Sequence, residues 1–336
     1  MSEAPESGPR EKVELRLQEM KIVLDPEIPY QLEKVFPKIT GWGSNAEIKR
    51  RGKLIRLVEP VLAKMLLANE EVWYVAKGVQ YSLAENYFMG ALWAAMMNQT
   101  VFVFTNARLL MMRSNNSGKP TEMFWMIYYS EIDHFKSTWT GVLSLKLSDK
   151  KTLKFTNFPS LDRKSMPPIF QAALDDYRAH GLVPMASQSK ENLCCHCFQV
   201  VAKGDYVCNH CGTEYWTPKQ LALRSLLFPS WGDICMRHYV IAFIELLGYL
   251  VSWGIAAAGL VSSNPAEGLF TVAFIFLIEH PLDAIMTYFV ASKGLSHRRD
   301  AAPDFVAVEA VNRDPASGDE DPEASALGSQ HADDFR

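Results

Sequence analysis

The chain has 336 residues, a formal net charge of −4 and six cysteines. Its length is enough for two or three domains, and its weakly acidic charge gives no sign of affinity for nucleic acid. Six cysteines are too few for a fold built on disulfides, and the charged N-terminus, from Glu3 to Lys21, lacks the apolar core of a cleavable signal peptide.

Residues 1–44 are predicted to be mostly irregular, because their beginning is rich in Ser, Glu, Pro and Gly. Residues 45–69 then have the period of an amphipathic helix. Its apolar face carries Leu54, Leu57, Val58, Val61, Leu62, Met65 and Leu66. Pro60 is expected to bend or divide this helix, because proline removes a backbone donor.

The front half of this helix is basic, with Lys49, Arg50, Arg51, Lys53 and Arg56. Close to a membrane such a cluster attracts anionic lipid at about 1 kcal/mol per charge. These five residues are therefore candidates for a lipid-facing or partner-facing surface. The alternative is a solvated helix face that binds nothing.

Residues 70–181 have the period of β-strands. Six short runs, at 72–76, 100–105, 108–113, 122–129, 143–147 and 153–155, have strand composition. A helix is predicted from Pro167 to His180, opened by two prolines and ended by Gly181. Antiparallel strands followed by one helix indicate a small barrel that the helix plugs at one end.

Two stretches of this segment resemble a known family. Residues 104–109 (Phe-Thr-Asn-Ala-Arg-Leu) are similar to a hairpin of GRAM and bacterial pleckstrin-homology-like domains, and residues 129–132 (Tyr-Ser-Glu-Ile) resemble the strand end that follows it. The resemblance covers residues 70–181. It implies a split or bent barrel that binds lipids, peptides or neighbouring proteins and has no catalytic role.

The first connection between strands departs from that family. Phosphoinositide-binding members have Lys and Arg there, whereas residues 83–97 include Phe88, Leu92, Trp93, Met96 and Met97. A headgroup pocket at this place is therefore not expected. The apolar insertion is either a helix that packs in the core or a patch that faces the membrane or a partner.

Two C-x-x-C pairs, Cys194 with Cys197 and Cys208 with Cys211, are separated by ten residues. This spacing brings four thiolates around one Zn²⁺ ion, so residues 182–218 are identified as a zinc ribbon with one structural Zn²⁺ per chain. Cys195 is left out of the ligand set. A disulfide pair is the alternative, which a cytoplasmic segment disfavours. Because protein fills all four positions, no position remains for a catalytic water.

The middle positions of the two pairs contain His196 and His210, which are expected to face solvent rather than the metal. After the ribbon, residues 219–238 form an amphipathic juxtamembrane segment. Residues 300–336 are rich in Pro, Ala, Ser, Gly, Asp and Glu, and are predicted to be a disordered acidic tail.

Two apolar runs, 239–261 and 269–291, are each 23 residues long, and about 20 residues cross a bilayer core. The short connection between them has no Lys or Arg. Arg224 and Arg237 precede the first run, and Lys293, Arg298 and Arg299 follow the second. Because Lys and Arg stay in the cytoplasm, both flanks are predicted to be cytoplasmic. Two buried helices of a soluble domain are the alternative.

The predicted spans contain polar residues that we describe as a polar seam: Glu245, Tyr249, Glu279, His280 and Asp283. Glu279 and Asp283 are four residues apart and share one helix face with Thr287. The seam either holds the helices together through hydrogen bonds or forms an ion or proton path. Two helices cannot enclose a pore alone, so a path requires oligomers or a partner.

The sequence thus predicts an α+β multidomain membrane protein with a pleckstrin-homology-like β-barrel, a small zinc ribbon and a two-helix transmembrane hairpin. It is expected in the cytoplasmic (inner) membrane with both termini cytoplasmic. The favoured function is a scaffold or sensor that binds a protein partner or lipid, with homo-oligomers possible. A subunit of a channel or transporter is the alternative. An enzyme is the weakest option, because no nucleophile elbow, phosphate loop or open metal site is found, and nucleic-acid binding lacks the basic stripe it needs.

Overall fold

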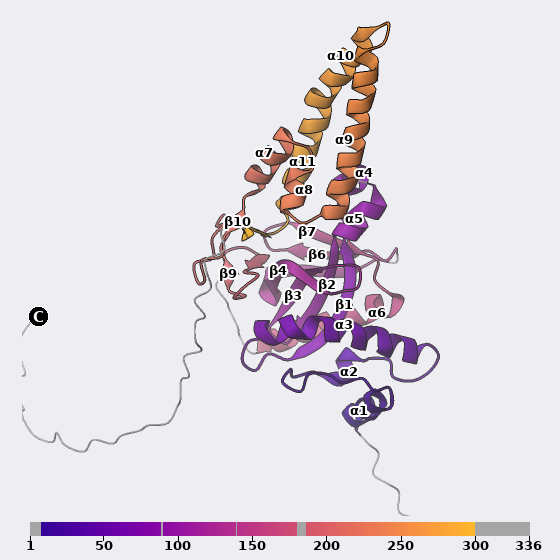
Figure 1. Ribbon diagram of the computed structural model, residues 1–336. Helices are drawn as coiled ribbons and strands as arrows, with labels where there is room; N and C mark the ends of the chain where they lie inside the picture. The colour runs from indigo at the N-terminus through magenta and orange to yellow at the C-terminus, as the bar shows by residue number, and fades with distance from the viewer. Residues whose placement is uncertain (1–7, 89, 139, 180–185, 300–336) are drawn as a thin grey trace, which may run out of the picture. The chain divides into compact units, whose positions relative to one another are not determined.

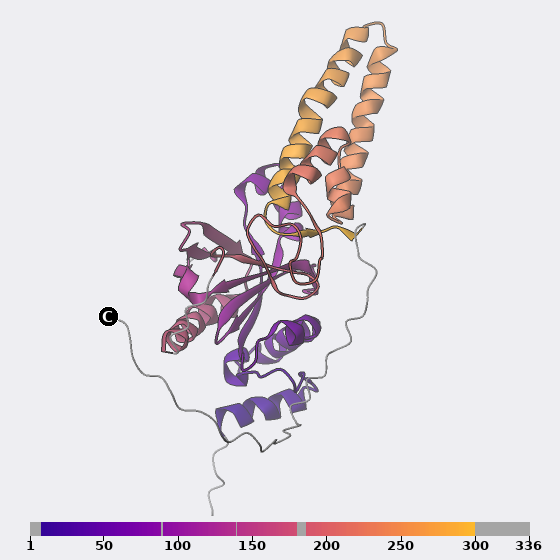
Figure 2. The same ribbon diagram turned by 90° about the vertical axis from the view of Figure 1, so that its left-hand side faces the viewer.

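The computed structural model describes residues 8–88, 90–138, 140–179 and 186–299. The predicted acidic tail lies outside the described residues, as do the first seven residues. Three helices precede the sheet: α1 (Pro9–Glu19), α2 (Leu32–Val35) and α3 (Ser44–Met65). They cover one face of the sheet (Figures 1 and 2).

The prediction of a mostly irregular segment over residues 1–44 missed helix α1. Only Val13 and Leu17 of this helix are buried, one turn apart, so its apolar period is too short to recognise in the sequence. Helix α3 continues through Pro60 and is not divided there. Pro60 is exposed, so water can satisfy the carbonyl group that loses its donor.

The central sheet has nine strands, all antiparallel to their neighbours, in the order β5-β6-β7-β1-β2-β3-β4-β8-β9. The strands are β1 (Val72–Gln80), β2 (Gln99–Thr105), β3 (Arg108–Ser114), β4 (Pro120–Tyr128), β5 (Ile132–Ser137), β6 (Leu143–Leu147), β7 (Thr152–Thr156), β8 (Glu191–Leu193) and β9 (Val200–Val201). A 3₁₀ turn, η1 (Tyr129–Glu131), separates β4 from β5. Among the described residues no pairing joins β4 to β5, so the sheet is open and does not close into a barrel.

Both faces of the sheet are covered, which explains why β2 and β3 are buried along their whole length. Phe102 and Phe104 point to the side of helix α6 (Ser160–Ala179), whereas Val101 and Val103 point to the side of α3. Helix α6 begins seven residues before the predicted Pro167. Its first turns contain the buried Asp162, which pairs with α3 rather than with water.

The apolar insertion between β1 and β2 forms two short helices, α4 (Leu83–Phe88) and α5 (Ala91–Met97). Met97 is buried, and Trp93 packs beside it, in a cluster with residues of the two long apolar helices. Leu83 and Leu92 are 71% and 68% exposed. One side of this insertion is therefore core and the other side is an exposed apolar surface.

After the cysteine-containing loops, the chain forms β10 (Tyr215–Trp216), α7 (Pro218–Leu227), α8 (Trp231–Cys235), α9 (Tyr239–Leu260), α10 (Pro265–Phe274), a π-helical turn η2 (Ile275–Glu279), α11 (His280–Ala291) and β11 (Ser296–His297). Two helices, Tyr239–Leu260 and Pro265–Ala291, are long and apolar enough to cross a membrane. Only 17% of each apolar window is buried inside the protein, so most of these side chains face outward.

The two long helices run side by side (Figure 1). Near their connection they approach closely at Gly259 and Gly268, where a Cβ on Gly268 would lie 2.3 Å from the backbone nitrogen of Leu260. In the second helix, η2 precedes Pro281, and the His280 amide reaches the carbonyl of Ile275 five residues back. A proline that lacks its own N–H favours such a local widening of the helix.

Candidate functional site

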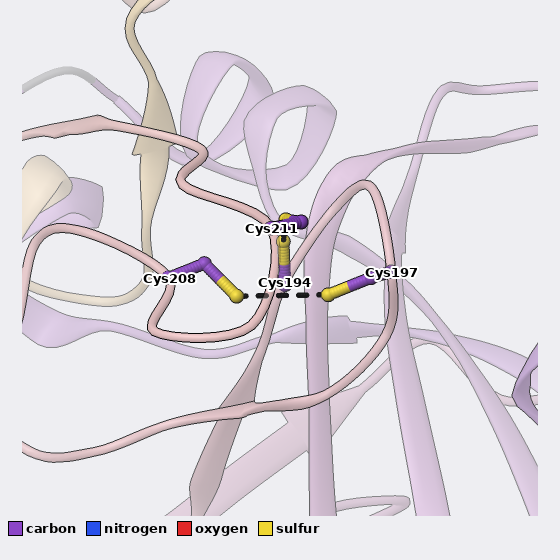
Figure 3. A group of neighbouring side chains, drawn as sticks. All are labelled: Cys194, Cys197, Cys208 and Cys211. Atoms are coloured by element: carbon purple, nitrogen blue, oxygen red, sulfur yellow. Dashed lines mark hydrogen bonds between the residues drawn. The ribbon is translucent and has the colours of Figure 1, made fainter. Parts of the chain in front are cut away.

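Four cysteine sulfurs lie together at the edge of the sheet. The Sγ atoms of Cys194 and Cys211 are 3.5 Å apart, those of Cys197 and Cys208 are 3.6 Å apart, and all four lie within 4.8 Å of one another. Figure 3 shows the four thiols converging from two loops. Tetrahedral Zn²⁺ with Zn–S bonds of about 2.3 Å requires sulfur–sulfur distances of roughly 3.8 Å. The donor set therefore fits one metal ion.

The two loops have the same local structure. The Phe198 amide donates to the Cys194 carbonyl (3.1 Å), and the Gly212 amide donates to the Cys208 carbonyl (2.8 Å). Both Phe198 and Gly212 have positive φ, 57° and 73°. Each C-x-x-C pair thus sits in a tight turn that aims both of its thiols at the same point.

Cys195 lies outside the group of four close sulfurs. His196 and His210 are exposed, in agreement with their position in the middle of each pair. Tyr215, whose role the sequence does not indicate, lies beside the sulfurs. Its hydroxyl donates to Cys194 Sγ (3.0 Å) and accepts from the Cys195 amide (3.0 Å). No spacing rule in the sequence indicates this contact.

The cysteine-containing segment connects two parts of the fold. On one side β8 extends the central sheet by pairing with β4, where Leu193 lies opposite Phe124. On the other side β10 pairs with β11, so that Tyr215 lies opposite His297 and Trp216 opposite Ser296. The segment therefore contacts both the sheet and the chain that leaves the second long helix.

Residues of the predicted polar seam line a cavity of about 390 Å³ between the long helices. Glu245, Tyr249, Glu279 and Asp283 line it. His280 contacts it through Tyr249, whose hydroxyl is 3.3 Å from His280 Nε2. All five predicted seam residues are thus close together.

Hydrogen bonds of the seam lead to helix α7, which packs along α11. His280 Nδ1 donates to the carbonyl of Leu226 (2.8 Å), while its Nε2 lies 3.3 Å from the Tyr249 hydroxyl. Asp283 Oδ2 accepts from the amide of Ser230 (2.8 Å). The Leu226 carbonyl and the Ser230 amide lie where α7 ends and α8 begins, so helix hydrogen bonds do not satisfy them. The side chains of His280 and Asp283 supply the missing partners.

Other polar side chains complete this junction. The Ser225 hydroxyl is 2.8 Å from that of Thr287 and accepts from the amide of Gly232 (3.2 Å). Glu279 bonds to the first long helix instead, where the Ser252 hydroxyl donates to it (2.6 Å). The junction with α7 was not predicted, because nothing in the sequence tells which segment an intramembrane polar residue will meet.

Asp233 of α8 joins the seam acids. Carboxylate oxygens of Asp233, Glu245 and Asp283 lie within 4.8 Å of one another, and Asp233 Oδ1 also accepts from His238 Nδ1 (3.0 Å). Glu245 and Asp283 are close in depth, as their positions along the two helices predict. An acidic cluster of this kind needs bound protons or close donors to be stable in an apolar surrounding.

The predicted basic surface of α3 is only partly a surface. Lys49, Lys53 and Arg56 are exposed. Arg51 is 1% exposed and donates to Asp162 (2.5 Å), to the Tyr74 hydroxyl and to a backbone carbonyl, and Arg50 bonds to the same carboxylate (3.0 Å). Arg50 and Arg51 therefore link α3 to α6, and the buried Arg51 does not present a charge at the surface.

Glu47 completes this buried network. Burial raises the pKa of its carboxyl, but hydrogen bonds from Arg50 and Arg51 outweigh burial, so the pKa is lowered overall. The network is a structural clamp between helices on opposite faces of the sheet.

No family model and no curated protein matches the chain. Among solved structures, the chain is similar to the C-terminal domain of an unknown protein from Leishmania infantum, at 16% sequence identity and a TM-score of 0.26. This likeness covers 35% of this chain and 97% of that domain. A TM-score this low supports no assignment of fold or function.

Proposed function

We propose that this protein is a non-catalytic scaffold or sensor anchored in the cytoplasmic membrane. In this proposal a pleckstrin-homology-like domain and a structural zinc ribbon are held at the cytoplasmic surface, where they bind a protein partner or lipid. The observation that carries the proposal is the double attachment of the cysteine-containing segment, through β8 to the sheet and through β10 to the chain after the second long helix.

The pleckstrin-homology-like assignment is supported by the order of the elements. Seven consecutive antiparallel strands, β1 to β7, are followed by a helix, α6, that packs on the sheet. The sheet is open between β4 and β5, which agrees with a split rather than a closed barrel.

Zinc is the metal that we assign to the four thiols, because four thiolates at tetrahedral distances suit Zn²⁺ and fill its coordination. When bound, the ion supplies a rigid cross-link between the two cysteine loops. Cys194, Cys197, Cys208 and Cys211 would hold it, and the Tyr215 hydroxyl would orient the Cys194 thiolate.

Affinity purification from detergent-solubilised membranes, after mild cross-linking, tests the proposal. We expect a specific protein or lipid to remain with the parent chain. A variant that combines Lys49→Ala, Lys53→Ala and Arg56→Ala removes three exposed charges from the front half of α3 and is expected to weaken this retention. The proposal fails if the chain is recovered in the soluble fraction, or if the parent retains no partner beyond a control membrane protein.

The second candidate function is a subunit of a channel or transporter, which the cavity lined by Glu245, Glu279 and Asp283 favours. The hydrogen bonds argue for a structural role instead, because Glu279 and Asp283 each bind a defined partner. The side-chain amide oxygen of Gln or Asn can accept the same hydrogen bond at each position. We therefore expect that Glu279→Gln with Asp283→Asn leaves folding nearly unchanged, since such bonds are worth about 0.6 kcal/mol.

Reconstitution into liposomes distinguishes the two functions. We expect no flux of protons or monovalent cations through the parent protein or through the Glu279→Gln, Asp283→Asn double variant. Flux through the parent that disappears in a well-folded double variant would establish the transport function and contradict the structural role.

A further inference from the structure

A second cavity, of about 590 Å³, lies where the sheet meets the beginning of the first long helix. One side is apolar and includes Trp93 and Met96 of α5, together with Val240 and Ile241 from the first turn of α9. Its volume lies within the range of about 300–1,000 Å³ that is usual for ligand sites. The apolar side is continuous with the outward-facing residues of α9, such as Val240, which is 58% exposed.

The other side of the cavity is polar and contains Arg113, Ser114 and Ser296. Arg113 is only 5% exposed. Its Nη2 donates to Asn98 Oδ1 (3.2 Å), but its Nη1 has no hydrogen-bond partner among the described residues. The hydroxyl groups of Ser114 and Ser296 are also buried without a partner there. Three buried polar groups that remain unsatisfied at one cavity are costly unless a ligand completes them.

The charges around this polar side favour an anion. Glu122 lines the same cavity, but Arg237 (3.1 Å) and Arg299 already pair with it. Glu85 pairs with Lys293, which also bonds to Asn98 (2.9 Å). No carboxylate among the described residues is therefore paired with Arg113.

Burial disfavours the charged forms of two cations in this region, Arg113 and Lys293. Burial lowers the pKa of Arg113, and Glu85 only partly opposes this effect. Burial also lowers the pKa of Lys293, to about 8, again opposed by Glu85. A bound anion would stabilise the charged form of both side chains.

We propose that this cavity binds one anionic phospholipid. The phosphate group contacts Arg113 and the hydroxyl groups of Ser114 and Ser296, while the upper part of an acyl chain lies between α5 and α9 and continues along α9 into the bilayer. The proposal rests on the membrane anchoring proposed above and names a ligand for it. It differs from a headgroup site in the first inter-strand connection, because the charge comes from β3 and that connection contributes only apolar residues of α5.

Binding of phosphatidylglycerol to the delipidated full-length protein in a non-ionic detergent tests the proposal. Native mass spectrometry would count the bound lipids, and a titration would give the Kd. We expect one retained phosphatidylglycerol per chain, at least tenfold weaker binding of phosphatidylcholine, and no comparable binding of glycerol 3-phosphate. Equal binding of phosphatidylcholine, or equal binding of glycerol 3-phosphate alone, would overturn the proposal.

Four variants locate the site. Arg113→Gln removes the buried charge, and Met96→Glu places a carboxylate on the cavity wall from a partly exposed position, so both are expected to raise the Kd at least tenfold. Met96→Leu is the matched control for volume, and Lys164→Gln removes an exposed charge of α6 outside the cavity; both should bind like the parent. If Arg113→Gln does not fold, Met96→Glu alone decides, and unchanged binding by Met96→Glu contradicts the proposal.

Fractionation of cells separates failure of this inference from failure of the proposed function. A chain recovered without membranes would contradict the anchoring itself. A membrane-inserted chain that binds phosphatidylglycerol no better than phosphatidylcholine would contradict only the lipid site.

Discussion

The residue after each cysteine pair has a left-handed backbone conformation. Gly212 adopts it without steric cost, whereas for a residue with a Cβ, such as Phe198, it costs roughly 1–2 kcal/mol. The Phe198 ring packs against Phe124 of β4, with ring centroids 5.4 Å apart. This contact holds the strained residue in place and connects the first cysteine loop to the sheet.

The ligand assignment gives a test at single cysteines. We expect Cys208→Ser to abolish zinc binding, because it removes one of four thiolates, and elemental analysis of the purified chain would show less than one zinc. Cys195→Ser is the matched control and should retain the metal, since Cys195 lies outside the four close sulfurs. Zinc retained at the parent level by Cys208→Ser would contradict the assignment.

The buried arginine of α3 gives a second test. Arg51→Gln leaves Asp162, which is 0% exposed, without its closest cation, and breaking a buried ion pair costs about 3–5 kcal/mol. We expect a clear fall in the melting temperature of the full chain in detergent. Lys49→Gln removes an exposed charge from the same helix and should change stability by no more than about 0.5 kcal/mol. Equal melting of the two variants would refute the clamp.

Among the elements, α7 has the most unusual position. The carbonyl of Leu226, in its last turn, contacts His280 at the start of α11. The distance along α11 from His280 to its end at Ala291 is roughly 16 Å, at about 1.5 Å per residue. Exposed leucines line the outer side of α7: Leu223, Leu226 and Leu227. If α11 crosses a bilayer, α7 enters the apolar layer from the same surface and turns back.

A photoreactive phenylalanine analogue tests this position of α7. Placed at Leu226, it should cross-link to phospholipid acyl chains in membranes, whereas at Lys203, which is exposed in the cysteine-containing segment, it should not. Gly232→Val is expected to abolish the cross-link at Leu226, because a Cβ at Gly232 would lie 2.4 Å from Thr287 Cγ2 and displace α7 from α11. Cross-linking to lipid at both positions or at neither would exclude this arrangement.

Elements with a strong period were predictable, and so was the cysteine cluster. The two long apolar helices begin and end within a few residues of the predicted runs, apart from the start of the second, because length and hydrophobicity determine them locally. The C-x-x-C spacing is likewise a local signal. Helix α1 and the pairing of β8 with β4 were not predictable, since they depend on what packs against them and on which strand edges meet.

Within the candidate sites too, local sequence signals were predictable and packing partners were not. The seam residues could be selected because charged groups in an apolar run are rare. Their partners at Leu226 and Ser230 could not, because both are backbone groups of a segment whose own sequence is only amphipathic. Arg51 was assigned to a surface because the basic residues are consecutive, although a helix places successive residues on different faces.

In the whole molecule, the pairing of β10 with β11 constrains the topology. Residues before the first long helix and after the second are hydrogen-bonded neighbours, so both flanks lie on one side of any membrane that the helices cross. We expect reporter fusions after Gly181 and after Arg299 both to be cytoplasmic, because the cations of the flanks favour that side. A cytoplasmic result for one fusion and an external result for the other would be incompatible with the β10–β11 pair.

The same strand pair sets an order of events during synthesis. Seventy-nine residues separate Trp216 from Ser296, and at about 5–20 residues per second a ribosome needs roughly 4–16 s to make them. During that interval β10 has an unpaired edge, and it gains its partner only after the second long helix has left the ribosome. A closed β10–β11 pair therefore marks a nascent chain whose helical hairpin is complete, whereas a chain that stops before Ser296 keeps an open strand edge that proteases and chaperones can recognise.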